Sequence, residues 1–99
     1  MTRPFYSDYV RHAMRFYARN LEMTCFKSDV DKMNWTSCHT IIQTYSEQDR
    51  DILIKVYGGF DTLPDNVYLV AETNDIDQHY IWDMMKEFER KIAERRKLI

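Results

Sequence analysis

Turn-forming residues are scarce in this chain. It has two glycines, adjacent at Gly58-Gly59, and two prolines, Pro4 and Pro64, in 99 residues. Strands joined by tight turns need many more of them, because Gly and Pro supply the backbone conformations that turns require. The sequence therefore favours helices.

Three helix starts are marked by side chains that can cap them. Each is a Ser or Thr followed by an Asp three residues later: Ser28 with Asp31, Ser46 with Asp49, and Thr62 with Asp65. The hydroxyl oxygen accepts a free backbone N–H, and the acid faces the positive end of the helix dipole. These spacings place helix starts near residues 29, 47 and 64.

The spacing of apolar residues predicts five helices, roughly at residues 5–20, 29–45, 47–58, 64–73 and 77–96. The third ends at Gly58-Gly59, since glycine can take the left-handed conformation that caps a helix. Hydrophobic residues at 44% and aromatics at 14% can build a core without disulfides or metal. We expect an all-α single domain over 1–99, with 1–44 as a helical support and 45–99 ending in a helix-turn-helix.

The last two predicted helices have the spacing of a helix-turn-helix. Pro64 lies just inside the first of them, where a missing N–H costs nothing. Ala71 is a small side chain where two steeply crossing helices come close. Ile76 fills the turn, Asp77 caps the second helix, and the buried line of that helix starts at Ile81.

Residues 45–96 also carry a pattern of residue classes that a known family shares. The pattern consists of the run Tyr45 to Tyr57, the pairs Val70-Ala71 and Ile76-Asp77, then Ile81, and the run Phe88 to Ile92. It resembles region 4 of bacterial sigma-70-type factors and the small sigma-region-4-like regulators of phages and mobile elements. Residues 1–44 match no sigma region.

The resemblance implies a DNA-binding transcription regulator, of phage or mobile-element origin, whose partner is double-stranded DNA. The family inserts the second helix of its motif into the major groove, with side chains near the helix start on base edges. The residues that this places on bases are Gln78, His79, Tyr80 and Trp82. Lys86 and Arg90 would contact phosphate.

The charge of the chain is unevenly distributed. Residues 61–85 contain six acids and no Lys or Arg, although DNA affinity comes mostly from neutralising phosphates. Two basic features could supply that affinity: a stripe at every fourth residue of the first helix, and the basic end 86–97. The stripe consists of Arg11, Arg15 and Arg19. In the alternative interpretation both are solvated helix faces paired with acids, such as Glu87, Glu89 and Glu94 of the last helix.

The acidic segment supports a second hypothesis, a protein-binding module. Its acidic 61–83 surface and Trp82 would engage a basic partner such as RNA polymerase or a nucleic-acid-handling enzyme. In its extreme form this module is a phage inhibitor that mimics the charge of DNA. Monomer and homodimer both stay open, since many DNA readers pair two heads on two half-sites.

Catalytic and metal-binding patterns are missing from the sequence. His12, His39 and His79 fall on different predicted helices, and the neighbours Cys38 and His39 point about 100° apart on a helix, so they cannot form a nucleophile–base pair. We expect no enzyme, no cofactor and no metal site. No apolar run has the length of a signal peptide or of a membrane span of roughly 20 residues, so we expect a cytoplasmic protein without membrane contact.

Overall fold

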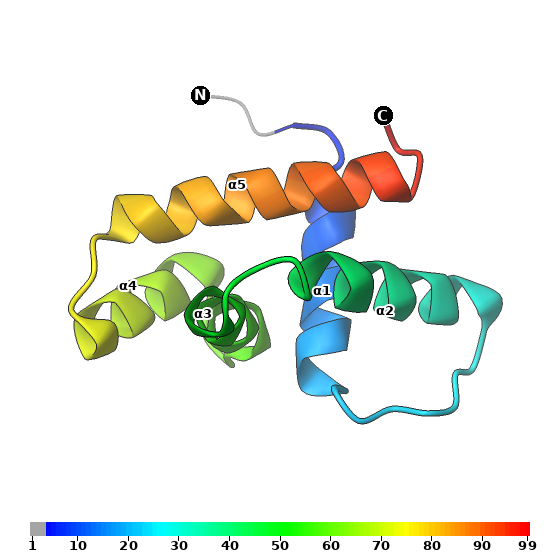
Figure 1. The fold of residues 1–99 in the computed structure, drawn as a ribbon, viewed down its shortest axis with the longest axis horizontal. Helices are drawn as coiled ribbons and strands as arrows, with labels where there is room; N and C mark the ends of the chain where they lie inside the picture. Colours follow the sequence, from blue (N-terminus) through cyan, green and yellow to red (C-terminus); the bar gives the residue numbers. More distant parts are fainter. Residues whose placement is uncertain (1–3) are drawn as a thin grey trace.

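Five α-helices form the fold of residues 4–99, the part of the chain that this computed structural model describes (Figure 1). In chain order they are α1 Ser7–Arg19, α2 Asp29–Ile42, α3 Glu47–Gly58, α4 Leu63–Asn74 and α5 Gln78–Arg95. The described residues include no strand. The predicted all-α class is confirmed, and every predicted helix boundary lies within three residues of the observed one.

The predicted caps form at all three helix starts. The hydroxyl oxygens of Ser28, Ser46 and Thr62 accept the backbone N–H three residues on, at 3.1, 3.2 and 3.3 Å. Asp77 caps α5 in a related way, because its carboxylate accepts the backbone N–H of His79 at 2.8 Å. Local sequence therefore determines where α2, α3, α4 and α5 begin.

Helix α3 ends at Gly58 as predicted, but not through a left-handed glycine, because no glycine of the described residues has a positive φ. Gly59 has an extended backbone instead, with φ −64° and ψ 157°. Arginine side chains of α1 bind the carbonyls at this end of α3, so these groups are satisfied without a left-handed turn. A side chain is nevertheless excluded, since a Cβ on Gly59 would lie 2.6 Å from the Asn66 amide.

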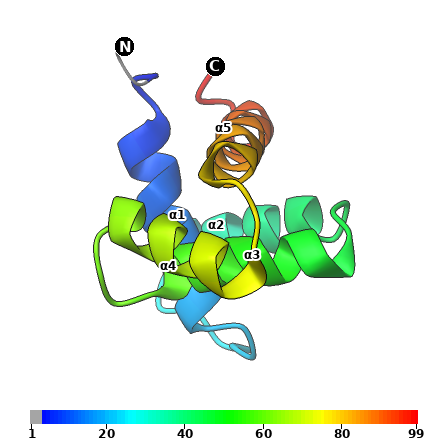
Figure 2. The same cartoon turned by 90° about the vertical axis from the view of Figure 1, so that its left-hand side faces the viewer.

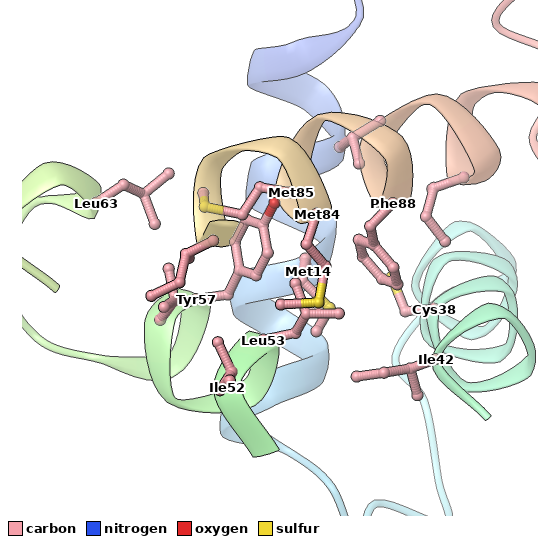
Figure 3. Packing of buried hydrophobic residues seen from close by; sticks show 14 of the residues in the cluster. Met14, Cys38, Ile42, Ile52, Leu53, Tyr57, Leu63, Met84, Met85 and Phe88 are labelled. Atoms are coloured by element: carbon pink, nitrogen blue, oxygen red, sulfur yellow. The ribbon is translucent and has the colours of Figure 1, made fainter. Parts of the chain in front are cut away.

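The helices pack around α5, which lies above α2, α3 and α4 while α1 runs steeply past it (Figures 1 and 2). A single cluster of buried side chains draws on all five helices (Figure 3). Its members include Met14 of α1, Ile42 of α2, Leu53 of α3, Leu63 of α4 and Phe88 of α5. Residues of the first two helices thus share one core with the segment 45–99.

The two cysteines lie in opposite environments, which gives a testable difference in reactivity. Cys38 is fully buried in the core and Cys25 is exposed. Burial raises the pKa of the Cys38 thiol to about 12. Because the thiolate is the reactive form, we expect iodoacetamide at mildly alkaline pH to modify Cys25 in the folded protein and Cys38 only after unfolding. Mass spectrometry should find one adduct on the native chain and two in urea.

Cys25→Ser is the matched control for this experiment, since it should give no adduct on the folded protein and one on the unfolded protein. Two adducts on the native wild-type chain would show that Cys38 is accessible, which would contradict its burial in the core.

Candidate nucleic-acid interface

The helices α4 and α5 are joined by a turn of three residues, Asp75, Ile76 and Asp77. Asp75 takes the left-handed conformation, with φ 52° and ψ 51°, which Asp tolerates better than most residues. The backbone N–H of Ile76 donates to the carbonyl of Ala71 at 3.0 Å, and the Ile76 side chain packs half-buried against the core. Ala71 and Ile81 are buried on either side of the turn, as predicted.

The four residues predicted to contact bases do not share one face of α5. Gln78, His79 and Tyr80 are exposed, whereas Trp82 is half-buried against the core. Successive residues of a helix point about 100° apart. Three of the four, Gln78, His79 and Trp82, line a hollow of about 490 Å³ beside α4. Ala71 and Glu72 of α4 and Ile76 and Asp77 of the turn complete its lining.

Tyr80 is directed to the other flank of α5. Its hydroxyl donates to the carboxylate of Asp49, near the start of α3, at 2.7 Å. This hydrogen bond raises the pKa of Tyr80 above its ordinary value, because the Asp49 carboxylate accepts the phenol proton. About half of the Tyr80 side chain is still exposed, at 49%. A base contact by Tyr80 stays a prediction.

The outer line of α5 consists of four exposed residues three or four positions apart: His79, Asp83, Lys86 and Arg90. Lys86 makes no ion pair or side-chain hydrogen bond with any residue that the structure describes. Arg90 pairs with Glu94 one turn further on, and both side chains are more than half exposed, at 54% and 52%. Such an exposed ion pair contributes little to stability. Lys86 and Arg90 are therefore both available to an external anion.

The first arginine of the α1 stripe is bound inside the molecule. The Nε of Arg11 donates to Oε2 of Glu89 at 2.9 Å, and only 18% of the Arg11 side chain and 4% of the Glu89 side chain are exposed. The same Glu89 oxygen accepts the Tyr57 hydroxyl at 2.6 Å. Burial, and next the charge of Glu89, raise the pKa of Tyr57 well above its ordinary value. Arg11 thus belongs to a buried ion pair that joins α1, α3 and α5.

The other two arginines of the stripe bind the loop between α3 and α4. Arg15 donates to the carbonyls of Gly59 and Asp61 at 3.3 and 3.4 Å, and Arg19 donates to Gly59 at 2.9 Å. The Arg19 guanidinium also lies 5.6 Å from the ring centre of Phe60. This loop precedes α4, whose length is about 18 Å at 1.5 Å per residue. The stripe and the start of α5 therefore lie at opposite ends of α4, and phosphate contact by the stripe stays a prediction.

A second surface, which we call the α4 face, combines acids with exposed apolar side chains. It consists of Phe60, Asp61, Asp65, Tyr68, Leu69 and Glu72. Phe60 is 96% exposed, and Tyr68 and Leu69 are 54% and 60% exposed. Phe60 and Leu69 border a hollow of about 410 Å³ between α3 and α4. The exposed apolar side chains of the α4 face were not predicted from the sequence, although Tyr68 and Leu69 fall outside the line of buried residues that Val67 and Val70 define.

A third surface, the basic corner, lies where α2 passes below the C-terminal half of α5 (Figures 1 and 2). It consists of Lys32 and Thr36 of α2 with Arg95 and Arg96 at the end of α5, and these residues surround a hollow of about 450 Å³. The sequence indicated the two arginines only as part of the basic end. Lys32 was missed, because it lies more than 60 residues away along the chain.

The histidines are dispersed in the structure. His39 Nδ1 lies 2.9 Å from the Tyr17 hydroxyl, and the His39 ring stacks on Trp35 at 4.8 Å between ring centres. Among residues 4–99, no three or more His, Cys, Asp and Glu side chains are grouped so that they could hold a metal ion. Over the same range, no helix combines the length and the apolar character that a bilayer span needs.

Comparison with known proteins gives no family for this chain: no protein-family model matches it, and neither does a curated protein or a solved structure. The resemblance to sigma region 4 consequently depends on the pattern of residue classes in 45–96.

Proposed function

We propose that this protein is a DNA-binding transcription regulator of the sigma-region-4 type, a class carried by phages and mobile elements. The observation that supports the proposal is the outer line of α5, which starts directly after a tight turn and which no other helix of residues 4–99 covers. A helix presented in this way fits the major groove of DNA. Gln78, His79 and Trp82 would then meet base edges, with Lys86 and Arg90 at the phosphates.

The charges around this line make the expected binding weak and dependent on salt. Asp77 and Asp83 lie among the proposed contacts, and acids repel phosphates. Two cations remain to neutralise phosphate on this line, and each phosphate contact releases counterions from the DNA. We therefore expect measurable affinity at low salt, with a slope of log affinity against log salt of about −2, as for two phosphate contacts.

The test is a fluorescence anisotropy titration with a short labelled duplex at several salt concentrations. Lys86→Ala and Arg90→Ala should each weaken binding and lower the slope of log affinity against log salt by about one. Lys55→Ala is the matched control, because Lys55 is an exposed lysine of α3 that pairs with Asp51. A wild-type protein that binds no duplex at the lowest salt would overturn the proposal.

The α4 face favours a second candidate function, a protein-binding module. Phe60, Tyr68 and Leu69 are exposed among acids, an arrangement that suits a basic partner such as RNA polymerase or a nucleic-acid-handling enzyme. Trp82 offers a partner less exposed surface than expected from the sequence, because it is half-buried. An inhibitor that mimics the charge of DNA is the extreme form of this candidate.

The two candidates predict opposite mutational patterns. If the chain binds purified bacterial RNA polymerase through the α4 face, Tyr68→Ala with Leu69→Ala should weaken that complex about tenfold or more, as expected for apolar hot-spot residues. Lys86→Ala with Arg90→Ala should leave it unchanged. Biolayer interferometry with both double variants separates a protein-binding surface from a DNA-binding one.

A further inference from the structure

We infer that the basic corner is a binding site for a phosphate group, separate from the outer line of α5. Arg95 follows Lys86 by nine residues, which is roughly two and a half helical turns, so the two side chains point to opposite sides of α5. A straight duplex along the outer line does not reach the corner. The inference therefore does not depend on the proposed function.

The packing of α2 against α5 brings the polar groups of the corner together. Lys32 and Thr36 lie one turn apart on α2 and face the same hollow as Arg95 and Arg96. The hollow thus has three cations and the hydroxyls of Thr36 and Ser37 around it. Guanidinium groups match the geometry of phosphate oxygens, and an ammonium or hydroxyl supplies further donors.

The guanidinium of Arg96 is already held in place before any ligand binds. Its Nε donates to Oδ1 of Asn34 at 2.8 Å, and its Nη2 lies 3.4 Å from the Tyr9 hydroxyl. Asn34 is buried and donates in turn to Tyr9 at 3.2 Å. Two of the five N–H donors of the guanidinium are used, so the others stay free for an anion. A side chain that is already ordered loses less entropy on binding.

The remaining cations of the corner have no partner among the residues that the structure describes. Lys32 and Arg95 make no ion pair or side-chain hydrogen bond within the described residues 4–99. The acids next to them in the chain are Asp31 and Glu94, and Glu94 is engaged by Arg90. A phosphate group brings about one to two negative charges and several acceptor oxygens. The corner therefore offers such a group enough positive charge to neutralise it, around a single hollow.

The experiment is an NMR titration of the labelled full chain with sodium phosphate, compared with sodium chloride at equal ionic strength. We expect amide shifts confined to residues 32–37 and 94–97. Lys32→Gln with Arg95→Gln should lower phosphate affinity about tenfold, the effect of losing charge-assisted contacts. Lys27→Gln with Lys55→Gln removes the same charge elsewhere and should change nothing. Gln forms helices well, so both double variants should keep the fold.

A second arm identifies the source of the phosphate. If a nucleic-acid backbone occupies the corner, a short duplex should shift the same amides and displace inorganic phosphate. If free phosphate or a small phosphorylated molecule is the ligand, the duplex should leave these amides unmoved. Both results support a phosphate site. The phosphate site is contradicted if phosphate shifts no amide of the corner, or if both double variants show the same shifts. Neither outcome depends on whether Lys86 and Arg90 bind DNA.

Discussion

Arg11→Met is expected to destabilise the protein by about 3–5 kcal/mol, because it leaves the buried Glu89 without its counter-charge. Glu89 is 3% exposed, and it accepts hydrogen bonds from Arg11 at 2.9 Å and Tyr57 at 2.6 Å. Without the guanidinium, the buried Glu89 carboxylate keeps the hydrogen bond from the Tyr57 hydroxyl but has no positive charge beside it. Urea unfolding followed by circular dichroism measures the loss.

Two further variants show whether the buried charge is the cause. Lys55→Met breaks the exposed pair with Asp51 and should cost about 0.5 kcal/mol or less. Arg11→Met combined with Glu89→Gln removes both charges and keeps an acceptor for Tyr57, so most of the lost stability should return. If Arg11→Met costs no more than Lys55→Met, the ion pair does not hold the core as described.

Phe88→Ala is expected to cost about 3–5 kcal/mol through the cavity that it creates. The Phe88 side chain is fully buried, with its ring centre 5.9 Å from that of Tyr45 and 6.2 Å from that of Tyr57. Phe60→Ala removes the same ring from a side chain that is 96% exposed, and it should change stability by about 0.5 kcal/mol or less. Thermal unfolding of both variants makes the comparison, and equal costs would contradict the assignment of Phe88 to the core.

The helices were predictable because their signals are local. A cap such as Ser46 acts on a backbone N–H three residues away, and a buried line such as Ile81, Phe88 and Ile92 recurs with the period of the helix. All three of these side chains are buried as expected. The end of α3 at residue 58 was predicted correctly, but the left-handed glycine expected there was wrong. The carbonyls at this end are satisfied instead by an arginine of α1, which lies about forty residues earlier in the chain.

The surfaces were less predictable, since they depend on partners that are distant in sequence. The spacing of the α1 arginines showed that they form a stripe, but it could not show that Glu89 and the α3–α4 loop face it. Glu89 was expected among the exposed acids of the last helix, where only Glu87 and Glu94 form the expected surface pairs. The sequence predicted that Tyr80 and Trp82 both contact bases. The hydrogen bond from Tyr80 to Asp49, however, directs the Tyr80 side chain toward α3.

The internal contacts of the α1 stripe affect how DNA-binding variants are interpreted. Arg11, Arg15 and Arg19 each have a partner inside the molecule, so replacing them lowers stability whether or not they touch phosphate. Loss of DNA binding by such a variant is informative only after its folding has been checked. Lys86 avoids this problem, because no described residue pairs with it.

We propose that double-stranded DNA binds along the outer line of α5. The most direct test of this claim is an NMR titration of the labelled full chain with a short duplex at low salt. We predict that the amides of residues 78–90 shift, that the shifts are largest around His79, Lys86 and Arg90, and that they disappear as salt is added. A duplex that shifts no amide of residues 78–90 at low salt would contradict the claim.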